Sequence, residues 1–219
     1  MTTTPFFFVF EGLDGSGKST QVRAVADQLR EGGWEVCVTR EPSDGPVGAQ
    51  LRRWIGQKTE GFGAVAESMT DDALTLALLF AADRQDHLRR VVLPALQQRS
   101  IVLCDRYVPS SLAYQGLDGA LSRVIQVNAS FPVPAWTFFY MLAPQAAFDR
   151  LRKRDPEGQE GDAFSSLQRL QIQEKGYRLA MDLLHRCGWP ILPLDANAPE
   201  RELTEQVFDI ILQSVVSEK

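Results

Sequence analysis

The sequence is poor in the residues that most often build metal and disulfide sites. Its 219 residues include only three cysteines and two histidines. Cys37, Cys104 and Cys187 are odd in number and far apart, and the first two lie in apolar, strand-like runs. We therefore expect reduced thiols in the core of a cytoplasmic protein. His87 and His185 have no close cysteine spacing, which argues against a structural zinc site.

Long hydrophobic runs and a basic surface are also missing. No stretch approaches the length of a membrane span, and the short apolar run near the N-terminus has no basic residue before it. The pattern favours a soluble, unexported protein with no membrane partner. The formal net charge of -5 disfavours nucleic acid as a partner, although a local positive cluster around a mononucleotide is compatible with it.

What the sequence does contain is a regular alternation of apolar runs and helix-like segments. The strands expected from these runs are residues 6–10, 35–39, 101–104, 137–142 and 191–194. The helices expected are residues 21–30, 71–90, 111–131, 145–154, 164–186 and 200–216, with a further short helix around residues 52–53. This order predicts one α/β domain over residues 1–219, with a parallel sheet covered by helices on both faces. The polar, acidic stretch at about residues 155–163 predicts a short lid loop.

The first apolar run leads into a phosphate-binding loop. Gly12, Gly17, Lys18 and Ser19 satisfy the G-x-x-x-x-G-K-[ST] pattern between a strand and a helix, which is the context that the pattern requires. Glycines let backbone N–H groups approach a polyanion, the lysine neutralises phosphate oxygens, and the serine hydroxyl coordinates Mg²⁺. The residues expected to bind ATP are Gly12, Leu13, Asp14, Gly15, Ser16, Gly17, Lys18, Ser19 and Thr20.

A charged pair follows the third expected strand. Asp105 and Arg106 come directly after an apolar run, and ligands in open α/β sheets sit beyond the carboxyl ends of the strands. Asp105 suits the Mg²⁺-binding role of a Walker B acid together with Ser19, and Arg106 suits a phosphate clamp.

Two further patterns each leave two interpretations open. Phe80 and Arg84 share one helical face, where they could form either an aromatic stack and planar donor for a nucleobase or ordinary core packing. Arg40 follows the second expected strand, and Arg52 lies on the helix after it. These two arginines could hold a second phosphate or simply lie on a solvated surface.

Taken together, these pieces resemble the thymidylate kinase family over nearly the whole chain. The matching segments are residues 11–20, 39–42, 51–52, 80–84, 105–107 and 110–116. The resemblance implies a P-loop kinase fold with a five-stranded parallel sheet, a homodimer, and the conversion of dTMP and ATP to dTDP and ADP for dTTP biosynthesis.

The resemblance also implies roles for individual residues. Asp14 would contact the 3′-hydroxyl of the acceptor sugar, and Phe80 would stack on thymine. Arg84, Ser111 and Gln115 would bind the polar edge of the base. Arg52 and Arg106 would hold the acceptor phosphate.

The chain departs from the family where a catalytic arginine is expected. Members carry it in the phosphate loop or in the lid, but this loop has Gly15, and residues 155–166 contain no arginine. The nearest candidates are Arg150, Arg152, Lys153 and Arg154. Arg150 and Arg154 are four residues apart on one helical face, so we expect this pair to act on the phosphates together with Lys18, Asp14 and Arg106. A second departure is Met141-Leu142-Ala143, where the family commonly has an aspartate after the leucine.

Two alternatives remain at this stage. One is a P-loop kinase for another nucleotide, a nucleoside or another small metabolite. The other is a nucleotide-binding relative with impaired catalysis, which the arginine-free lid would suit. A GTPase switch is disfavoured because neither Asn128 nor Asn197 is followed by the Lys-x-Asp that would read guanine.

Overall fold

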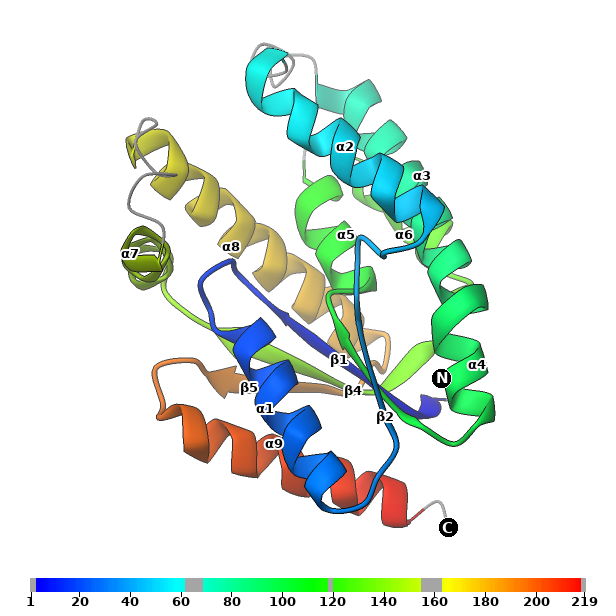
Figure 1. Ribbon diagram of the computed structural model, residues 1–219. Coiled ribbons are helices and arrows are strands. Elements are labelled where there is room, and N and C mark those ends of the chain that lie inside the picture. Colours follow the sequence, from blue (N-terminus) through cyan, green and yellow to red (C-terminus); the bar gives the residue numbers. More distant parts are fainter. Residues whose placement is uncertain (1–2, 62–68, 118–119, 155–162, 218–219) are drawn as a thin grey trace.

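The computed structural model describes residues 3–61, 69–117, 120–154 and 163–217, and its centre is a five-stranded parallel sheet (Figure 1). The strand order is β2-β3-β1-β4-β5. The strands are β1 (Thr3–Gly12), β2 (Val36–Arg40), β3 (Ile101–Asp105), β4 (Val133–Met141) and β5 (Ile191–Asp195). The predicted five-stranded parallel sheet is confirmed.

Helices cover both faces of this sheet. Helices α1 and α9 pack against one face, whereas α5 and α8 pack together on the other (Figure 1). The helices are α1 (Lys18–Glu31), α2 (Pro46–Gly61), α3 (Met69–His87), α4 (Leu93–Gln97), α5 (Val108–Gln115), α6 (Leu121–Asn128), α7 (Pro144–Arg154), α8 (Ala163–Arg186) and α9 (Glu200–Val216), with a π-helical turn η2 (Leu88–Val92) between α3 and α4.

The strand register brings the carboxyl ends of the strands to one edge. Phe10 of β1 pairs with Asp105 of β3, Arg40 of β2 pairs with the same Asp105, and Gly12 pairs with Tyr140 of β4. The loop after β1 therefore lies beside the residues that end β2, β3 and β4. This arrangement is the general position of ligand sites in open α/β sheets.

The apolar runs that predicted the strands form the centre of the core. Phe7, Phe8, Val9 and Phe10 of β1 are fully buried, as are residues 101–104 of β3. A strand that is covered on both faces needs apolar side chains at every position, which explains why these segments are continuous rather than alternating.

Some local predictions are wrong. The single helix expected over residues 111–131 is two helices, because the chain turns after Gly116 instead of continuing. The helix expected to end near residue 90 continues through η2 into α4 with Pro94 in its first turn, where a missing N–H costs no hydrogen bond. Cys104 is buried as expected, but Cys187 is exposed after α8 rather than in the core.

The remaining expectations concern the lid and membrane spans. Residues 155–162 of the predicted lid lie outside the described residues. Within the part of the chain that is described, no helix combines the length and the apolar character that crossing a membrane requires.

A glycine in the middle of α8 provides a test of the helix packing. A Cβ at Gly176 would lie 2.0 Å from the backbone oxygen of Ala113 in α5. Helix propensity alone predicts that Gly176→Ala stabilises the protein by about 1 kcal/mol. Because the Cβ meets backbone, we expect the opposite, a loss of about 1–3 kcal/mol in the free energy of unfolding.

Urea unfolding of Gly176→Ala measures this loss, with Lys175→Ala as the control at an exposed position of the same helix. A Gly176→Ala variant as stable as the parent would show that α5 and α8 do not pack this closely.

Candidate active site

The loop between β1 and α1 has the backbone of a phosphate-binding loop. Gly12, Gly15 and Gly17 have φ values of 146°, 82° and 92°, which side chains rarely adopt. Leu13 and Ser16 are buried within the loop, and the Ser16 hydroxyl has no hydrogen-bond partner in the described part of the chain. The loop therefore combines exposed backbone with a buried donor that a phosphate oxygen would satisfy.

Lys18 begins α1 and is almost completely buried at the bottom of the loop. Its Nζ donates to the Leu13 carbonyl at 3.3 Å and lies 3.5 Å from a carboxylate oxygen of Asp14. Burial, and next the positive charge of Arg106, lower the pKa of Lys18 below its ordinary value. Its long contacts leave the ammonium free to turn towards a phosphate, whose negative charge would favour the protonated form of the lysine.

The two residues predicted to bind a metal ion, Ser19 and Asp105, contact each other. The Ser19 hydroxyl donates to Oδ2 of Asp105 at 2.5 Å, although the two residues are 86 positions apart. The other oxygen of Asp105, Oδ1, is buried and has no partner among the described residues. A hydroxyl beside a carboxylate with an unsatisfied oxygen is a donor set that suits Mg²⁺.

Arg106 lies beside this pair in an unusual backbone conformation. Its φ is 73°, in the left-handed region that non-glycine residues seldom occupy. Its guanidinium donates to Asp14 at 2.8 Å, to Ser110 Oγ at 3.0 Å and to the Tyr177 hydroxyl at 2.7 Å. Burial acts to raise the pKa of Asp14, but Arg106 and Lys18 outweigh it, so that pKa lies below its ordinary value. The strained backbone of Arg106 is typical of functional positions.

A buried carboxylate, that of Glu11, holds the residues around Arg106 in place through hydrogen bonds. Glu11, the penultimate residue of β1, accepts hydrogen bonds from the backbone N–H groups of Tyr107 and Ser110 and from the hydroxyls of Ser110 and Tyr177. Burial raises the pKa of Glu11 despite these donors and the nearby charge of Arg106. The carboxylate thus ties β1, α5 and α8 to the turn that presents Arg106.

An apolar cavity of about 320 Å³ opens next to the phosphate loop. Five of the predicted acceptor residues line it, namely Asp14, Phe80, Arg106, Ser111 and Gln115. The remaining lining residues are Pro42, Leu76, Ser110 and Tyr114. The Oε1 of Gln115 and the Tyr114 hydroxyl are buried without hydrogen-bond partners among the described residues. The cavity therefore offers an aromatic face together with unsatisfied polar atoms.

The sequence put Phe80 and Arg84 on one face of a helix, but only Phe80 lines the cavity. Arg84 is only 1% exposed. It forms an ion pair with Glu41 at 2.7 Å, and it donates to Asn128 and, at 3.1 Å, to Ser111 Oγ. In this geometry its donors are engaged inside the protein, so the core interpretation holds for Arg84 while Phe80 faces the cavity. Arg84 acts on the cavity through Ser111.

Arg40 and Arg52 also lie outside the cavity lining. Both form ion pairs with Asp44, at 2.8 Å and 3.2 Å. Arg52 additionally donates to the carbonyl of Pro42 at 2.8 Å and to that of Ser43. Because Pro42 belongs to the cavity wall, Arg52 is the one of these two arginines that lies next to the acceptor side.

The two arginines expected to act as a pair on α7 have different surroundings. Arg150 donates to the carbonyl of Ala196 at 2.9 Å, in the loop between β5 and α9. Arg154 instead lines a cavity of about 270 Å³ that also includes Asp14. The geometry does not bring Arg150 and Arg154 to one point, because two long side chains on one helical face can extend in different directions.

Sequence reasoning missed the roles of Glu11, Tyr114 and Tyr177. Glu11 was included in the loop segment, but a carboxylate at the end of a buried strand is itself a signal, since such a group must find donors. Tyr177 could not be identified, because its contact with Glu11 spans 166 positions.

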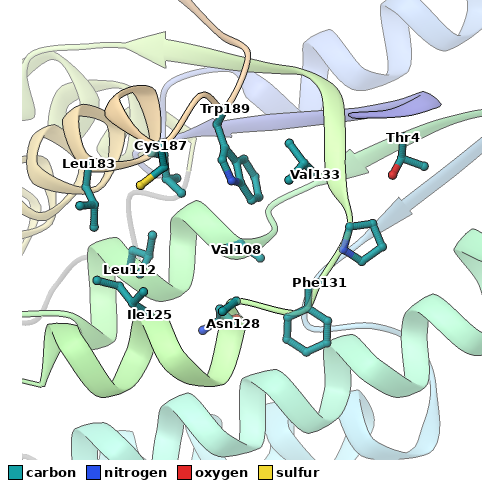
Figure 2. Close-up of a pocket in the computed structure, with 13 residues that line it drawn as sticks. Thr4, Val108, Leu112, Ile125, Asn128, Phe131, Val133, Leu183, Cys187 and Trp189 are labelled. Carbon is teal, nitrogen blue, oxygen red and sulfur yellow. The ribbon is translucent and has the colours of Figure 1, made fainter. Parts of the chain in front are cut away.

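A second apolar cavity, of about 370 Å³, lies elsewhere (Figure 2). Thr4 and Val133 in its lining belong to the first residues of β1 and β4, so it is at the amino-terminal side of the sheet. Figure 2 shows Trp189, Leu112 and Phe131 among its side chains. The phosphate loop lies at the carboxyl ends of the strands, so a cavity at their amino-terminal ends is not the nucleotide site.

Comparisons with known proteins point to one family. A family model described as thymidylate kinase matches residues 10–207. The chain is 36% identical over 211 residues to a thymidylate kinase of Anoxybacillus flavithermus, which covers 94% of this chain and 95% of the relative. It is 32% identical over 212 residues to a probable thymidylate kinase of Pyrobaculum calidifontis, with 96% and 98% covered. A probable thymidylate kinase of Pyrococcus horikoshii is 40% identical over 152 residues, with 68% and 71% covered.

The buried Arg84–Glu41 pair generates a prediction about stability. Removing one partner of a buried ion pair leaves an uncompensated charge and costs about 3–5 kcal/mol. We expect Arg84→Ala to lose that much free energy of unfolding in urea. Arg90→Ala is the matched control, because Arg90 pairs with Asp86 at the surface and exposed pairs contribute only about 0–1 kcal/mol. If both variants were equally stable, the buried pair would not be part of the folded protein.

Proposed function

The chain belongs to the thymidylate kinase family, and we propose that it transfers the γ-phosphoryl group of ATP to dTMP at the site described above. The observation that carries the proposal is the position of Asp14. This residue belongs to the phosphate loop, contacts Lys18 and Arg106, and also lines the apolar cavity. The donor phosphates and the acceptor nucleotide would therefore meet across one side chain, which is the proximity that a direct transfer requires.

On the donor side, the chain supplies positioning and charge. The backbone of the loop and the Ser16 hydroxyl would hold the phosphates of ATP, and Lys18 would neutralise the oxygens around the transferring group. Ser19 and Asp105 would hold Mg²⁺, which when bound neutralises charge on the phosphate oxygens. The preformed contact between these two side chains and the unsatisfied Asp105 Oδ1 support this assignment.

On the acceptor side, Arg106 would hold the phosphate of dTMP. Its guanidinium is already oriented by Asp14, Ser110 and Tyr177, and its backbone is held by the Glu11 network. A side chain fixed in this way loses little conformational freedom on binding, so its charge acts on the reacting phosphate in one defined position.

The cavity suits a pyrimidine base. Phe80 offers an aromatic ring for stacking. The Oε1 of Gln115 is a buried acceptor without a partner, and the N3–H of thymine would satisfy it. An adenine that presents its unprotonated N1 at the same place would leave that oxygen unpaired, which costs about 1–3 kcal/mol. Asp14, at the mouth of the cavity, would accept from the 3′-hydroxyl of the sugar.

We also propose a cytoplasmic homodimer whose product feeds dTTP synthesis. The assembly is supported by exposed apolar side chains along α3, η2 and α4, where Leu78, Val91 and Leu93 are 50%, 36% and 42% exposed. Exposed apolar side chains on adjoining elements are a common basis for contact between two copies. The cytoplasmic setting is supported by the three free thiols.

Lys18 gives the most direct mutational test of phosphoryl transfer. Because its charge acts on the transferring group, Lys18→Ala should lower kcat by about 10²–10³-fold, the usual effect of losing one donor to the transition state. The rate is measured as dTMP-dependent release of ADP, with and without EDTA. Chelation of Mg²⁺ should abolish turnover in the parent.

Lys153→Ala is the control, since Lys153 is exposed on α7 and lines neither cavity beside the loop. An unchanged kcat in a folded Lys18→Ala protein, or full turnover in EDTA, would rule out this mechanism.

A further inference from the structure

The cavity between α7 and α8 lies directly beside the phosphate loop. Figure 1 shows these two helices next to each other beyond the turn from β1 to α1. The cavity has a volume of about 270 Å³, and Asp14 of the loop is part of its wall. Its other lining residues are Phe148, Leu151, Arg154, Ser166, Arg169, Leu170 and Gln173. Asp14 also lines the acceptor cavity, so this one side chain belongs to the walls of both cavities.

Two arginines of this cavity lack a counter-charge in the part of the chain that the structure describes. Neither Arg154 nor Arg169 makes an ion pair or a hydrogen bond within the described residues, although arginines of the same helices elsewhere do. Arg178 pairs with Glu174, and Arg186 pairs with Asp182. Among the described residues that line the cavity, only Asp14 carries a carboxylate, and Arg106 and Lys18 already share it. Two unpaired guanidiniums at one cavity favour the binding of an anion.

Position 15 of the phosphate loop cannot carry such an arginine. Gly15 has a φ of 82°, and a Cβ there would lie 2.6 Å from the carbonyl oxygen of Ala147 and 3.1 Å from Leu151 Cγ. Because α7 packs directly on the loop, a side chain larger than that of glycine does not fit at position 15. Arg150 of α7 is engaged by Ala196 instead.

Arg169 lies on the same face of α8 as Tyr177. Arg169, Gln173 and Tyr177 follow one another at intervals of four residues and so lie along one face. Tyr177, at the far end of this row, contacts Arg106 and Glu11. The same face of α8 therefore runs from the acceptor phosphate site to the cavity that contains Arg154.

We propose that Arg169, together with Arg154, binds the transferring phosphoryl group and stabilises the transition state, a role that rests on the proposed function. A phosphate oxygen of dTMP forms a bond to the γ-phosphorus with its own electron pair. The bond from the γ-phosphorus to the oxygen that bridges it to the β-phosphate breaks, and that oxygen leaves on ADP with the bonding pair. Negative charge grows on the bridging and γ-oxygens, where two guanidiniums can share it. The catalytic arginine then comes from the second turn of α8 as well as from the end of α7.

The experiment compares Arg169→Ala, Arg154→Ala and the double variant with Lys175→Ala, an exposed position on α8 outside the cavity. An arginine that stabilises transferring phosphate contributes about 10³–10⁵ to kcat, so we expect Arg169→Ala to lower kcat at least about a hundredfold. The KM for dTMP and the melting temperature should change little. Added guanidinium ion should restore part of the lost rate, which a purely structural defect would not permit.

A binding measurement separates this inference from the proposed function. A pentaphosphate that links adenosine to thymidine spans both sites, and its affinity is measured by calorimetry without turnover. We expect Arg169→Ala, and not Lys175→Ala, to weaken its binding at least about tenfold, as transition-state contacts do for such analogues. Equal kcat or equal affinity in the parent and in Arg169→Ala would overturn the role of Arg169, whereas a parent without dTMP-dependent ADP release would overturn the proposed function.

Discussion

The site depends on the buried carboxylate of Glu11. Its two oxygens accept four hydrogen bonds, at 2.8–3.1 Å, from Tyr107, Ser110 and Tyr177. These donors come from the turn after β3, from α5 and from α8, so one group at the end of β1 joins all three. Ionised or protonated, a buried carboxyl without such partners would destabilise the fold by several kcal/mol. Its full set of donors is what allows Arg106 to keep a strained backbone at the place where two nucleotides would meet.

Charge at the carboxyl edge of the sheet is divided between buried structure and open surface. The Arg84–Glu41 pair lies in the interior and supports the acceptor cavity through Ser111. Asp14, in contrast, is 57% exposed on its side chain and keeps contacts with both Lys18 and Arg106. Contacts with the substrate can thus form at Asp14 without breaking the interior pair. Phe80 and Gln115 line the cavity, and in the proposed function they recognise the base.

The sheet and the donor side of the site could be predicted from the sequence, whereas the surroundings of single long side chains could not. The phosphate loop and the pairing of Ser19 with Asp105 follow from local patterns together with one rule of sheet topology. The positions of Arg84 and Arg150 depend on partners far away in the chain, Glu41 and Ala196, which no local spacing reveals. Arg169 lies on α8, past the end of the predicted lid at about residue 163, so a pattern that places the catalytic arginine in the lid does not point to it.

The most direct test of the account is the choice of acceptor. Release of ADP is measured in a coupled assay with dTMP, dUMP, UMP, CMP, AMP and GMP at saturating ATP and Mg²⁺. Because a buried polar atom left unpaired costs about 1–3 kcal/mol, or about 5- to 150-fold, and adenine carries no proton at N1, we expect kcat/KM for dTMP to exceed that for AMP by at least about tenfold. A kcat/KM for AMP as high as that for dTMP would contradict the assignment of the cavity lined by Phe80 and Gln115 as a thymine site.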